Sequence, residues 1–163
     1  MEQSRIELLQ QMPIFGGMRS DIAELLLSLS RTVSVRQGDF FFYEGDQGDS
    51  LFVLESGTAA VTKLRDGAAQ LICQLHSGEC FGEMAVMDMM PRSASVVAVE
   101  DCTAIEVPAA GLLRVYEQDI EQFVLFEMNM GREVSRRLRL TDERLWLAAA
   151  GSRNTQESPG EGS

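Results

Sequence analysis

The chain contains little positive charge. It has 163 residues, of which 14 are lysine or arginine and 25 are aspartate or glutamate, so its formal net charge is −11. Lys63 is the single lysine. Proteins that grip a phosphate backbone or an anionic membrane need basic residues in excess. The composition therefore argues against generic electrostatic binding to nucleic acid or to a membrane surface.

Histidine and cysteine are also scarce. His76 is the single histidine, which removes most metal sites and most histidine-based catalysis. The three cysteines, Cys73, Cys80 and Cys102, form no CxxC pair, and their odd number argues against a closed disulfide framework. We expect them to be small buried residues in a reducing cytosol. The predicted localisation is cytoplasmic.

Long apolar runs are missing as well. No stretch approaches the roughly 20 residues of a transmembrane helix. The first residues, MEQSRIELLQQMPIF, are polar where a signal peptide needs an apolar core. We therefore predict no membrane segment. At this length and with 45% hydrophobic residues, one globular domain is expected.

Residues 32–108 have the pattern of a β-domain. Short runs such as FFFYEG, LFVLESG, AAVTKL, QLICQL and ASVVAVE are separated by glycine, aspartate and serine. Asp66 and Gly67 lie between two of these runs, and both can adopt the positive φ that a two-residue hairpin turn requires. Short strands at this spacing predict an antiparallel sandwich or a rolled barrel.

Helices are predicted on both sides of the β-domain. Before it, one helix ends at Pro13 and a second follows a cap at Ser20 or Asp21. After it, a long helix is predicted over residues 119–150. The polar residues 151–163 are expected to form a disordered tail.

The second half of the long helix carries a regular stripe. Its members follow one another at alternating steps of four and three residues and are hereafter called the seam residues: Val134, Leu138, Thr141, Leu145 and Ala148. This is the spacing of a coiled-coil seam with one polar member. Two interpretations remain open, because the stripe can meet a second helix or pack on the chain's own β-domain.

The segment FGEMAVMDMMPRSASV, residues 81–96, carries the clearest chemistry. A glycine, Gly82, precedes a short helical turn, whose free N–H groups favour an anion. Arg92 adds a planar fork of donors suited to phosphate, and Ser93 adds a hydroxyl. Glu83 needs donor partners, which the hydroxyls of a sugar would supply. The combination predicts a ligand with one phosphate and a ribose.

This segment resembles the phosphate-binding cassette of cyclic nucleotide-binding domains, with the pattern FGE-apolar-A followed by PR-S/T-A-S/T-V. The preceding run VRQGDFFFYEGDQGDSLFVLESGTAAV is similar to the glycine-marked strands of that family. The resemblance covers residues 13–150. It implies a mainly β fold with flanking helices. The β-roll, antiparallel and of the jelly-roll type, would span residues 32–108. It would belong to one domain at residues 1–150.

The resemblance also implies which residues contact the ligand. Glu83 would accept a hydrogen bond from the ribose 2′-hydroxyl, with Gly82 lending its backbone, and Arg92 would pair with the cyclic phosphate. Other cassette residues would complete the phosphate cradle, and two apolar strand residues would wall the base. These further contacts are Met84, Ala85, Ser93, Ala94, Val61 and Ile72.

The run RRLRLTDE, residues 136–143, resembles the corresponding helix of bacterial cAMP receptor proteins. In that family a threonine bonds the adenine amino group, and Thr141 falls at its position. Asp142 stands where a serine usually reaches the ligand of a partner subunit, and as an acceptor it is expected to take the adenine N–H of that ligand. Arg137 aligns with an arginine that approaches the cassette glutamate, which predicts a pair with Glu83 in the bound state. The adenine contact favours cAMP over cGMP.

The predicted function is a non-catalytic cyclic-nucleotide sensor without metal or other cofactor. Its long C-terminal helix would signal by rearranging a homodimer or by receiving a protein partner. One alternative is a truncated transcription regulator, which would need a helix-turn-helix after residue 150. Another is a domain cut from a channel or kinase, although Met1 favours a natural start. A cupin-like metal enzyme would need two or three histidines and has only His76.

Overall fold

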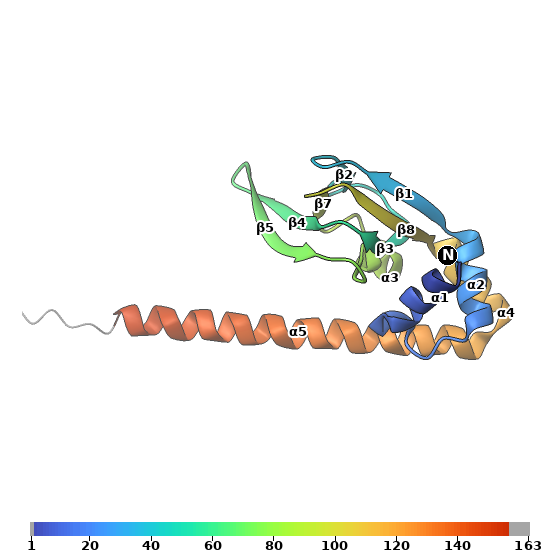
Figure 1. The fold of residues 1–163 in the computed structure, drawn as a ribbon. Helices are drawn as coiled ribbons and strands as arrows, with labels where there is room; N and C mark the ends of the chain where they lie inside the picture. The colour runs from blue at the N-terminus through green and yellow to red at the C-terminus, as the bar shows by residue number, and fades with distance from the viewer. Residues whose placement is uncertain (1, 157–163) are drawn as a thin grey trace, which may run out of the picture.

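The structure, a computed structural model, describes residues 2–156 and consists of a β-roll with helices at one end and along one side (Figure 1). One sheet has the strand order β1-β8-β3-β6 and the other β2-β7-β4-β5, and every pairing is antiparallel. The strands are β1 (Arg31–Val35), β2 (Phe40–Phe42), β3 (Ser50–Ser56), β4 (Ala59–Arg65), β5 (Ala68–Leu75), β6 (Cys80–Phe81), β7 (Ser95–Ala98) and β8 (Cys102–Pro108). The predicted antiparallel β-roll is confirmed.

The hairpin between β4 and β5 turns where the sequence predicts. Asp66 and Gly67 connect the strands, with φ of 51° and 78°. Positive φ at both central residues is the geometry of a type I′ turn, whose twist matches that of the flanking strands. Arg65 and Ala68 pair across the turn, so the register begins directly beside it.

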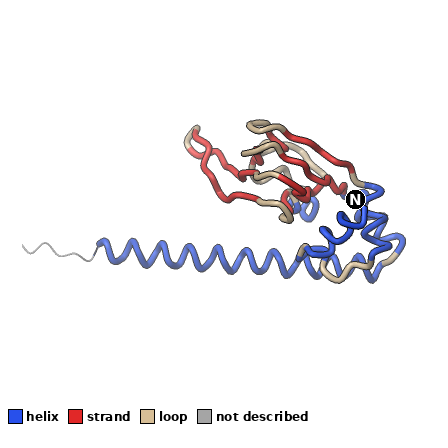
Figure 2. Tube along the Cα trace, in the orientation of Figure 1, coloured by secondary structure: helices blue, strands red, loops and turns tan. Residues whose placement is uncertain are grey.

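The helices are α1 (Glu2–Gln11), the 3₁₀ turn η1 (Pro13–Phe15), α2 (Ser20–Leu29), α3 (Glu83–Asp88), α4 (Ala109–Gln118) and α5 (Ile120–Gln156). All helices but α3 precede or follow the β-roll in the chain, and α3 lies between β6 and β7 within it (Figure 2). None of the helices in the described part of the chain has an apolar stretch long enough to cross a lipid bilayer.

Two predicted helix boundaries were wrong. The N-cap of α2 is Arg19 rather than Ser20 or Asp21, and it makes no side-chain capping bond. Asp21 instead accepts hydrogen bonds from the Arg19 guanidinium.

The long helix also ends later than predicted. It continues beyond residue 150 to Gln156, because three alanines precede Gly151 and the cost of one helical glycine, about 1 kcal/mol, does not end it. The rest of the predicted tail, residues 157–163, lies outside the described residues.

Buried side chains form two adjoining cores. One joins α1, η1, α2, α4 and the start of α5 to the first sheet, and the other lies between the two sheets. Cys80 and Cys102 are buried as expected, and burial raises the pKa of the Cys80 thiol to about 11. The expectation of burial was wrong for Cys73, which is exposed because β5 is uncovered along most of its length.

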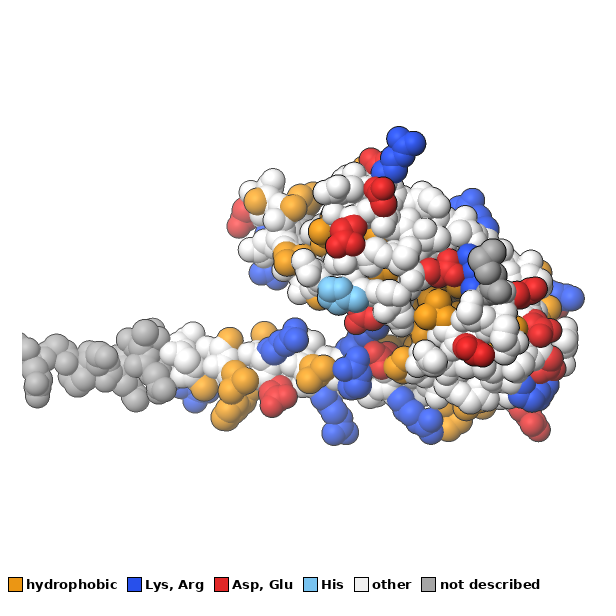
Figure 3. Space-filling view, in the orientation of Figure 1, with side chains coloured by type: hydrophobic (Ala, Val, Ile, Leu, Met, Phe, Trp, Pro, Cys, Tyr) orange, Lys and Arg blue, Asp and Glu red, His pale blue; other side chains and the backbone are white. Residues whose placement is uncertain are grey.

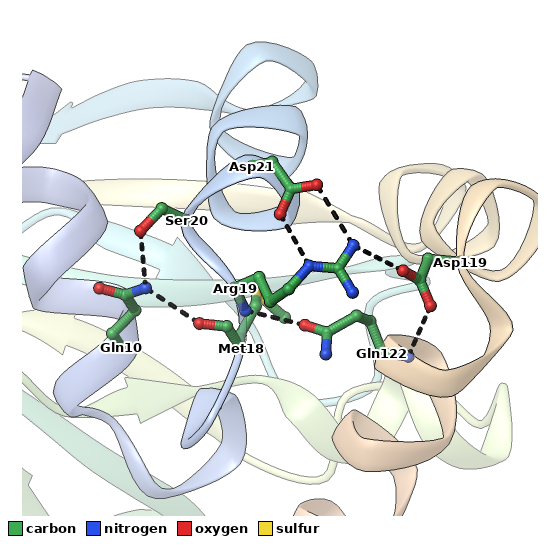
Figure 4. A network of polar contacts seen from close by, with 7 residues as sticks. All are labelled: Gln10, Met18, Arg19, Ser20, Asp21, Asp119 and Gln122. Atoms are coloured by element: carbon green, nitrogen blue, oxygen red, sulfur yellow. Dashed lines mark hydrogen bonds and ion pairs between the residues drawn. The ribbon is translucent and has the colours of Figure 1, made fainter.

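Polar contacts fix the first part of α5 to the N-terminal helices (Figure 4). The side chain of Gln122 accepts a hydrogen bond from the backbone N–H of Arg19 at 2.8 Å, and the Arg19 guanidinium contacts Asp119 at 2.6 Å. Further along α5, the buried Asn129 donates to the carbonyl of Gly16 at 2.8 Å. These contacts and the core hold the first turns of α5 in place, whereas its second half is exposed.

Replacing Asp119 by asparagine is expected to make stability less sensitive to acid. The hydrogen bond from Arg19, followed by one from the Gln122 backbone, holds the pKa of Asp119 below its usual value of 3.8. The charged carboxylate therefore stabilises the fold above that value, and this contribution is lost as the pH falls through the lower folded pKa. Urea unfolding at pH 7 and pH 3 measures the difference between the two proteins.

The difference in the free energy of unfolding should be present at pH 7 and shrink at pH 3. Asp142→Asn is the matched control, because this exposed carboxylate of α5 forms no ion pair within residues 2–156. A difference of equal size at both pH values would contradict the assignment.

Candidate functional site

A cavity of about 980 Å³ lies between the β-roll and α5. The space-filling view shows it as a hollow above the long helix (Figure 3). The predicted site residues that line it come from β4, β5, the cassette and α5: Val61, Ile72, Gly82, Glu83, Met84, Ala85, Arg92, Ser93, Ala94, Arg137 and Thr141. The fold therefore gathers these dispersed residues around one space.

Asp142 is the one predicted site residue outside the cavity lining. Successive residues of an α-helix are rotated by about 100°, so the position after Thr141 faces elsewhere. Its expected contact was with the ligand of a partner subunit, and that contact stays a prediction.

Arg92 is a buried cation at the cavity. It is 5% exposed, and its Nη1 donates to the carbonyl oxygens of Ser50 at 2.8 Å and Gly82 at 2.9 Å. Its guanidinium carbon lies 4.2 Å from the centre of the Phe42 ring. Burial lowers the pKa of Arg92, but a guanidinium stays charged at any physiological pH. Its Nε is buried and has no hydrogen-bond partner among the described residues.

Two glycines allow the guanidinium to lie where it does. A Cβ on Gly48 would be 2.2 Å from the Arg92 Nε, and one on Gly82 would be 2.8 Å from its Nη1. Gly82 also has φ of 78°, a conformation that few other residues adopt. Sequence patterns did not single out Gly48, although the paired glycines of EGDQGDS before a strand were a visible signal.

Glu83 connects the cassette to the long helix. It is 4% exposed, and its carboxylate forms an ion pair with the Nη1 of Arg137 on α5. The Nε of Arg137 also contacts Glu133 at 3.3 Å. The structure thus brings Glu83 and Arg137 together, and their pairing in the bound state stays a prediction. A buried carboxylate with one cationic partner retains acceptor capacity for a ligand hydroxyl.

The remaining predicted contacts are more open. Ser93 is exposed, and its hydroxyl makes one long contact, 3.7 Å to the sulfur of Met84. Thr141 is exposed and donates to the carbonyl of Arg137 at 3.0 Å, which leaves the lone pairs of its oxygen free to accept. Val61 is half-buried and Ile72 exposed, so the two form an uncovered apolar wall.

Several cavity residues were not anticipated. Lys63 lies two residues beyond Val61 on β4, and Arg144 lies three residues beyond Thr141 on α5. Strand alternation and helical spacing place them on the same faces as the predicted residues. This spacing is the sequence pattern from which the two could have been predicted. They add positive charge to the rim of the cavity in a chain that is acidic overall.

No metal centre is apparent at this cavity. Residues 2–156 contain no cluster of three or more histidine, cysteine, aspartate or glutamate side chains placed to hold a metal ion. The chemistry that the cavity offers is recognition of an anion at Arg92 and of hydroxyls at Glu83.

The sequence is similar to known protein sequences. The family model for the cyclic nucleotide-binding domain matches residues 32–119. A cyclic AMP receptor protein of Thermus thermophilus is 34% identical over 140 residues, which are 83% of this chain and 61% of that protein. A regulatory subunit of the cAMP-dependent protein kinase from Hypocrea atroviridis is 34% identical over 120 residues, 65% of this chain and 24% of that protein.

Solved structures share the fold. The catabolite activator protein of Thermus thermophilus aligns with a TM-score of 0.74 and 32% identity, covering 84% of this chain and 63% of that one. A cyclic nucleotide-binding domain from Methylobacillus flagellatus aligns with a TM-score of 0.78 and 22% identity, over 90% of this chain and 83% of that one. The chain spans less than two thirds of the length of the curated relatives it matches. By the extent of the family match and the arrangement of its cassette, the chain belongs to the cyclic nucleotide-binding domain family.

Proposed function

We propose that this chain is a cytoplasmic, non-catalytic sensor that binds cAMP in the cavity between the β-roll and α5. One observation carries the proposal: a buried arginine, Arg92, and a buried carboxylate, Glu83, line the same cavity. A cyclic phosphate and a ribose hydroxyl complement these two groups. Relatives named as a cyclic AMP receptor and as kinase regulatory subunits support the same conclusion.

The ligand would be held at three points. Arg92 would donate to the phosphate, with Ser93 and the backbone of the cassette around it. Glu83 would accept from the ribose 2′-hydroxyl. The base would lie against the apolar wall of Val61 and Ile72, with its amino group toward Thr141. Each polar group of the ligand then has a partner of opposite hydrogen-bonding character.

The signal would leave through α5. The ion pair between Glu83 and Arg137 ties the cassette to a part of α5 that is otherwise exposed. A ligand that contacts both Glu83 and Thr141 favours arrangements in which the cassette and α5 are close, which is a population shift. Such coupling between sites typically amounts to about 1–3 kcal/mol.

Parallel calorimetric titrations with cAMP and cGMP test the ligand assignment. Saturable binding with a preference for cAMP is expected, because the oxygen of Thr141 can accept from an adenine amino group. Binding of cGMP alone would discard the adenine contact and leave the phosphate site. Absence of binding by both nucleotides would overturn the proposed function.

Replacing Thr141 by valine is expected to weaken cAMP binding about tenfold, which is the typical worth of one buried hydrogen bond, and to leave cGMP binding nearly unchanged. The two calorimetric affinities and their ratio are the measurement. Ser135→Ala is the matched control, since Ser135 is an exposed hydroxyl residue of α5 outside the cavity lining. An unchanged ratio in the Thr141 variant would remove this residue from base recognition.

The same helix supports a homodimer. The seam residues are exposed, with Leu138 at 59% and Leu145 at 64%, so the alternative in which they pack on the chain's own β-roll is not found. A stripe at coiled-coil spacing on an uncovered helix suits a second copy of the same helix. We therefore include dimerisation through the seam residues in the proposal.

Replacing Leu138 by glutamate is expected to shift the protein from dimer to monomer. A charge at a seam position would have to be buried against the second helix without a partner. Leu147→Glu is the matched control, because Leu147 is a similarly exposed leucine of α5 away from the seam. Light scattering coupled to size-exclusion chromatography gives the masses, and equal behaviour of the two variants would contradict the interface.

A further inference from the structure

We propose that Ser50 and Glu106 are positioning residues for Arg92. They act as a hydrogen-bonded relay from the β1-β8-β3-β6 sheet to the cavity. The inference rests on the proposed function, since its purpose is to fix the group that meets the phosphate. Nothing in the cassette sequence indicates it, because both residues belong to strands outside residues 81–96. We call the pair the Glu106–Ser50 relay.

Ser50 holds Arg92 through two different oxygens. Its carbonyl oxygen accepts from Nη1 at 2.8 Å, and its side-chain oxygen lies 3.3 Å from Nη2. Ser50 is itself 4% exposed at the start of β3. Gly82 also accepts from Nη1, so backbone carbonyls of two segments hold the guanidinium.

Glu106 orients the hydroxyl of Ser50. The Ser50 hydroxyl donates to one carboxylate oxygen of Glu106 at 2.8 Å, and the Nε of Arg31 pairs with the other oxygen. A hydroxyl has one proton, and a carboxylate can only accept, so the proton of Ser50 is committed to Glu106. The lone pairs of the Ser50 oxygen then face Nη2 of Arg92. Without Glu106 the hydroxyl could rotate and present its proton to the cation.

The strand register builds this relay. Arg31 of β1 is directly opposite Glu106 of β8, and Glu106 is opposite Phe52 of β3, two residues from Ser50. Residues two apart on a strand share one face of the sheet, so the side chains of Arg31, Glu106 and Ser50 meet diagonally across three strands. Glu106 is also the foremost of the acidic groups that raise the pKa of Arg92 against the effect of burial.

The same sheet contains a matched control. Glu55, also on β3, is held by the guanidinium of Arg5 at 2.7 and 2.8 Å. Its side chain is as buried as that of Glu106, at 17% against 16% exposure. No hydrogen bond links Glu55 to Arg92 among the described residues. An effect of Glu106 that Glu55 does not share is therefore an effect on Arg92 and not on the sheet.

Calorimetric titration with cAMP tests the relay in four variants. Ser50→Ala and Glu106→Gln are expected to bind about tenfold more weakly than the wild type. Ser50→Thr restores a hydroxyl and should return the affinity to within about threefold of the wild type, which a packing defect at Ser50 would not allow. Glu55→Gln should bind as the wild type does. Wild-type affinity in Glu106→Gln and Ser50→Ala would overturn the relay.

A second readout needs no nucleotide and separates the relay from the proposed function. The Nε–H signal of Arg92 in a ¹H–¹⁵N spectrum, identified by its loss in Arg92→Lys, reports the setting of the guanidinium. It should shift in Glu106→Gln and stay in place in Glu55→Gln. A shift in a protein that binds no cAMP would support the relay and overturn the proposed function. An unmoved signal in a protein that binds cAMP would overturn the relay alone.

Discussion

Replacing Arg92 by alanine is expected to weaken cAMP binding by about a hundredfold or more. The phosphate would keep only backbone amides and the hydroxyl of Ser93, and a buried charge that loses its partner costs about 3–5 kcal/mol. At about 1.4 kcal/mol for each factor of ten, that range corresponds to two or more orders of magnitude in the dissociation constant. Calorimetric titration of the purified variant with cAMP is the measurement.

A loss of binding by Arg92→Ala reports on the site only if the variant protein is folded. Arg92 also donates to the carbonyls of Ser50 and Gly82, so its loss leaves buried acceptors unpaired and is expected to lower the melting temperature. Arg92→Lys keeps a cation in place but cannot reproduce the fork of donors, and it should bind weakly while remaining closer to wild-type stability. Arg114→Ala removes an exposed arginine of α4 and should bind normally. A folded Arg92→Ala protein with wild-type affinity would remove Arg92 from the site.

Replacing Glu83 by alanine is expected to abolish discrimination between cAMP and 2′-deoxy-cAMP. In the proposed complex of the wild type the ribose 2′-hydroxyl meets a buried carboxylate, and a hydrogen bond to a charged group contributes about 1.5–3 kcal/mol, or about ten- to hundredfold in affinity. In the variant that acceptor is missing, so the two nucleotides should bind equally weakly. The measurement is the ratio of the two dissociation constants in each protein.

Glu79 provides the control for the substitution of Glu83. It is another carboxylate of the cavity lining, but it lies before the cassette and accepts from the backbone of His76. Glu79→Ala should keep the wild-type ratio. If Glu83→Ala also kept it, the carboxylate of Glu83 would serve only its ion pair with Arg137 and not the ligand.

The cassette could be predicted from the sequence because its chemistry is local. Gly82, Glu83 and Arg92 lie within one short segment, where residue types and spacing are enough to suggest an anion beside a sugar. The hairpin at Asp66 and Gly67 was predictable for the same reason, since the turn conformation depends on these two residues. The strand runs and turn residues likewise indicated the β-roll.

The other features depend on contacts between residues that are far apart in the sequence. Gly48 matters because the Arg92 guanidinium lies against it, and the paired glycines of EGDQGDS do not say which distant residue approaches them. Ser50 meets Glu106 only through the register of β3 with β8. Cys73 looked like a core residue by type, but its strand faces outward. In each case the presence or absence of a neighbour that is distant in the sequence decides the role.

The central claim is that Arg92 and Glu83 together recognise a cyclic nucleotide, and equilibrium titration of the wild-type chain with cAMP and 5′-AMP tests it most directly. The cyclic phosphate is fixed beside the ribose, whereas the freely rotating phosphate of 5′-AMP would have to be ordered on binding to meet Arg92 while the ribose meets Glu83. We predict saturable binding of one cAMP per chain, with 5′-AMP at least about tenfold weaker. Equal affinity for the two nucleotides, or no binding of cAMP, would contradict the claim.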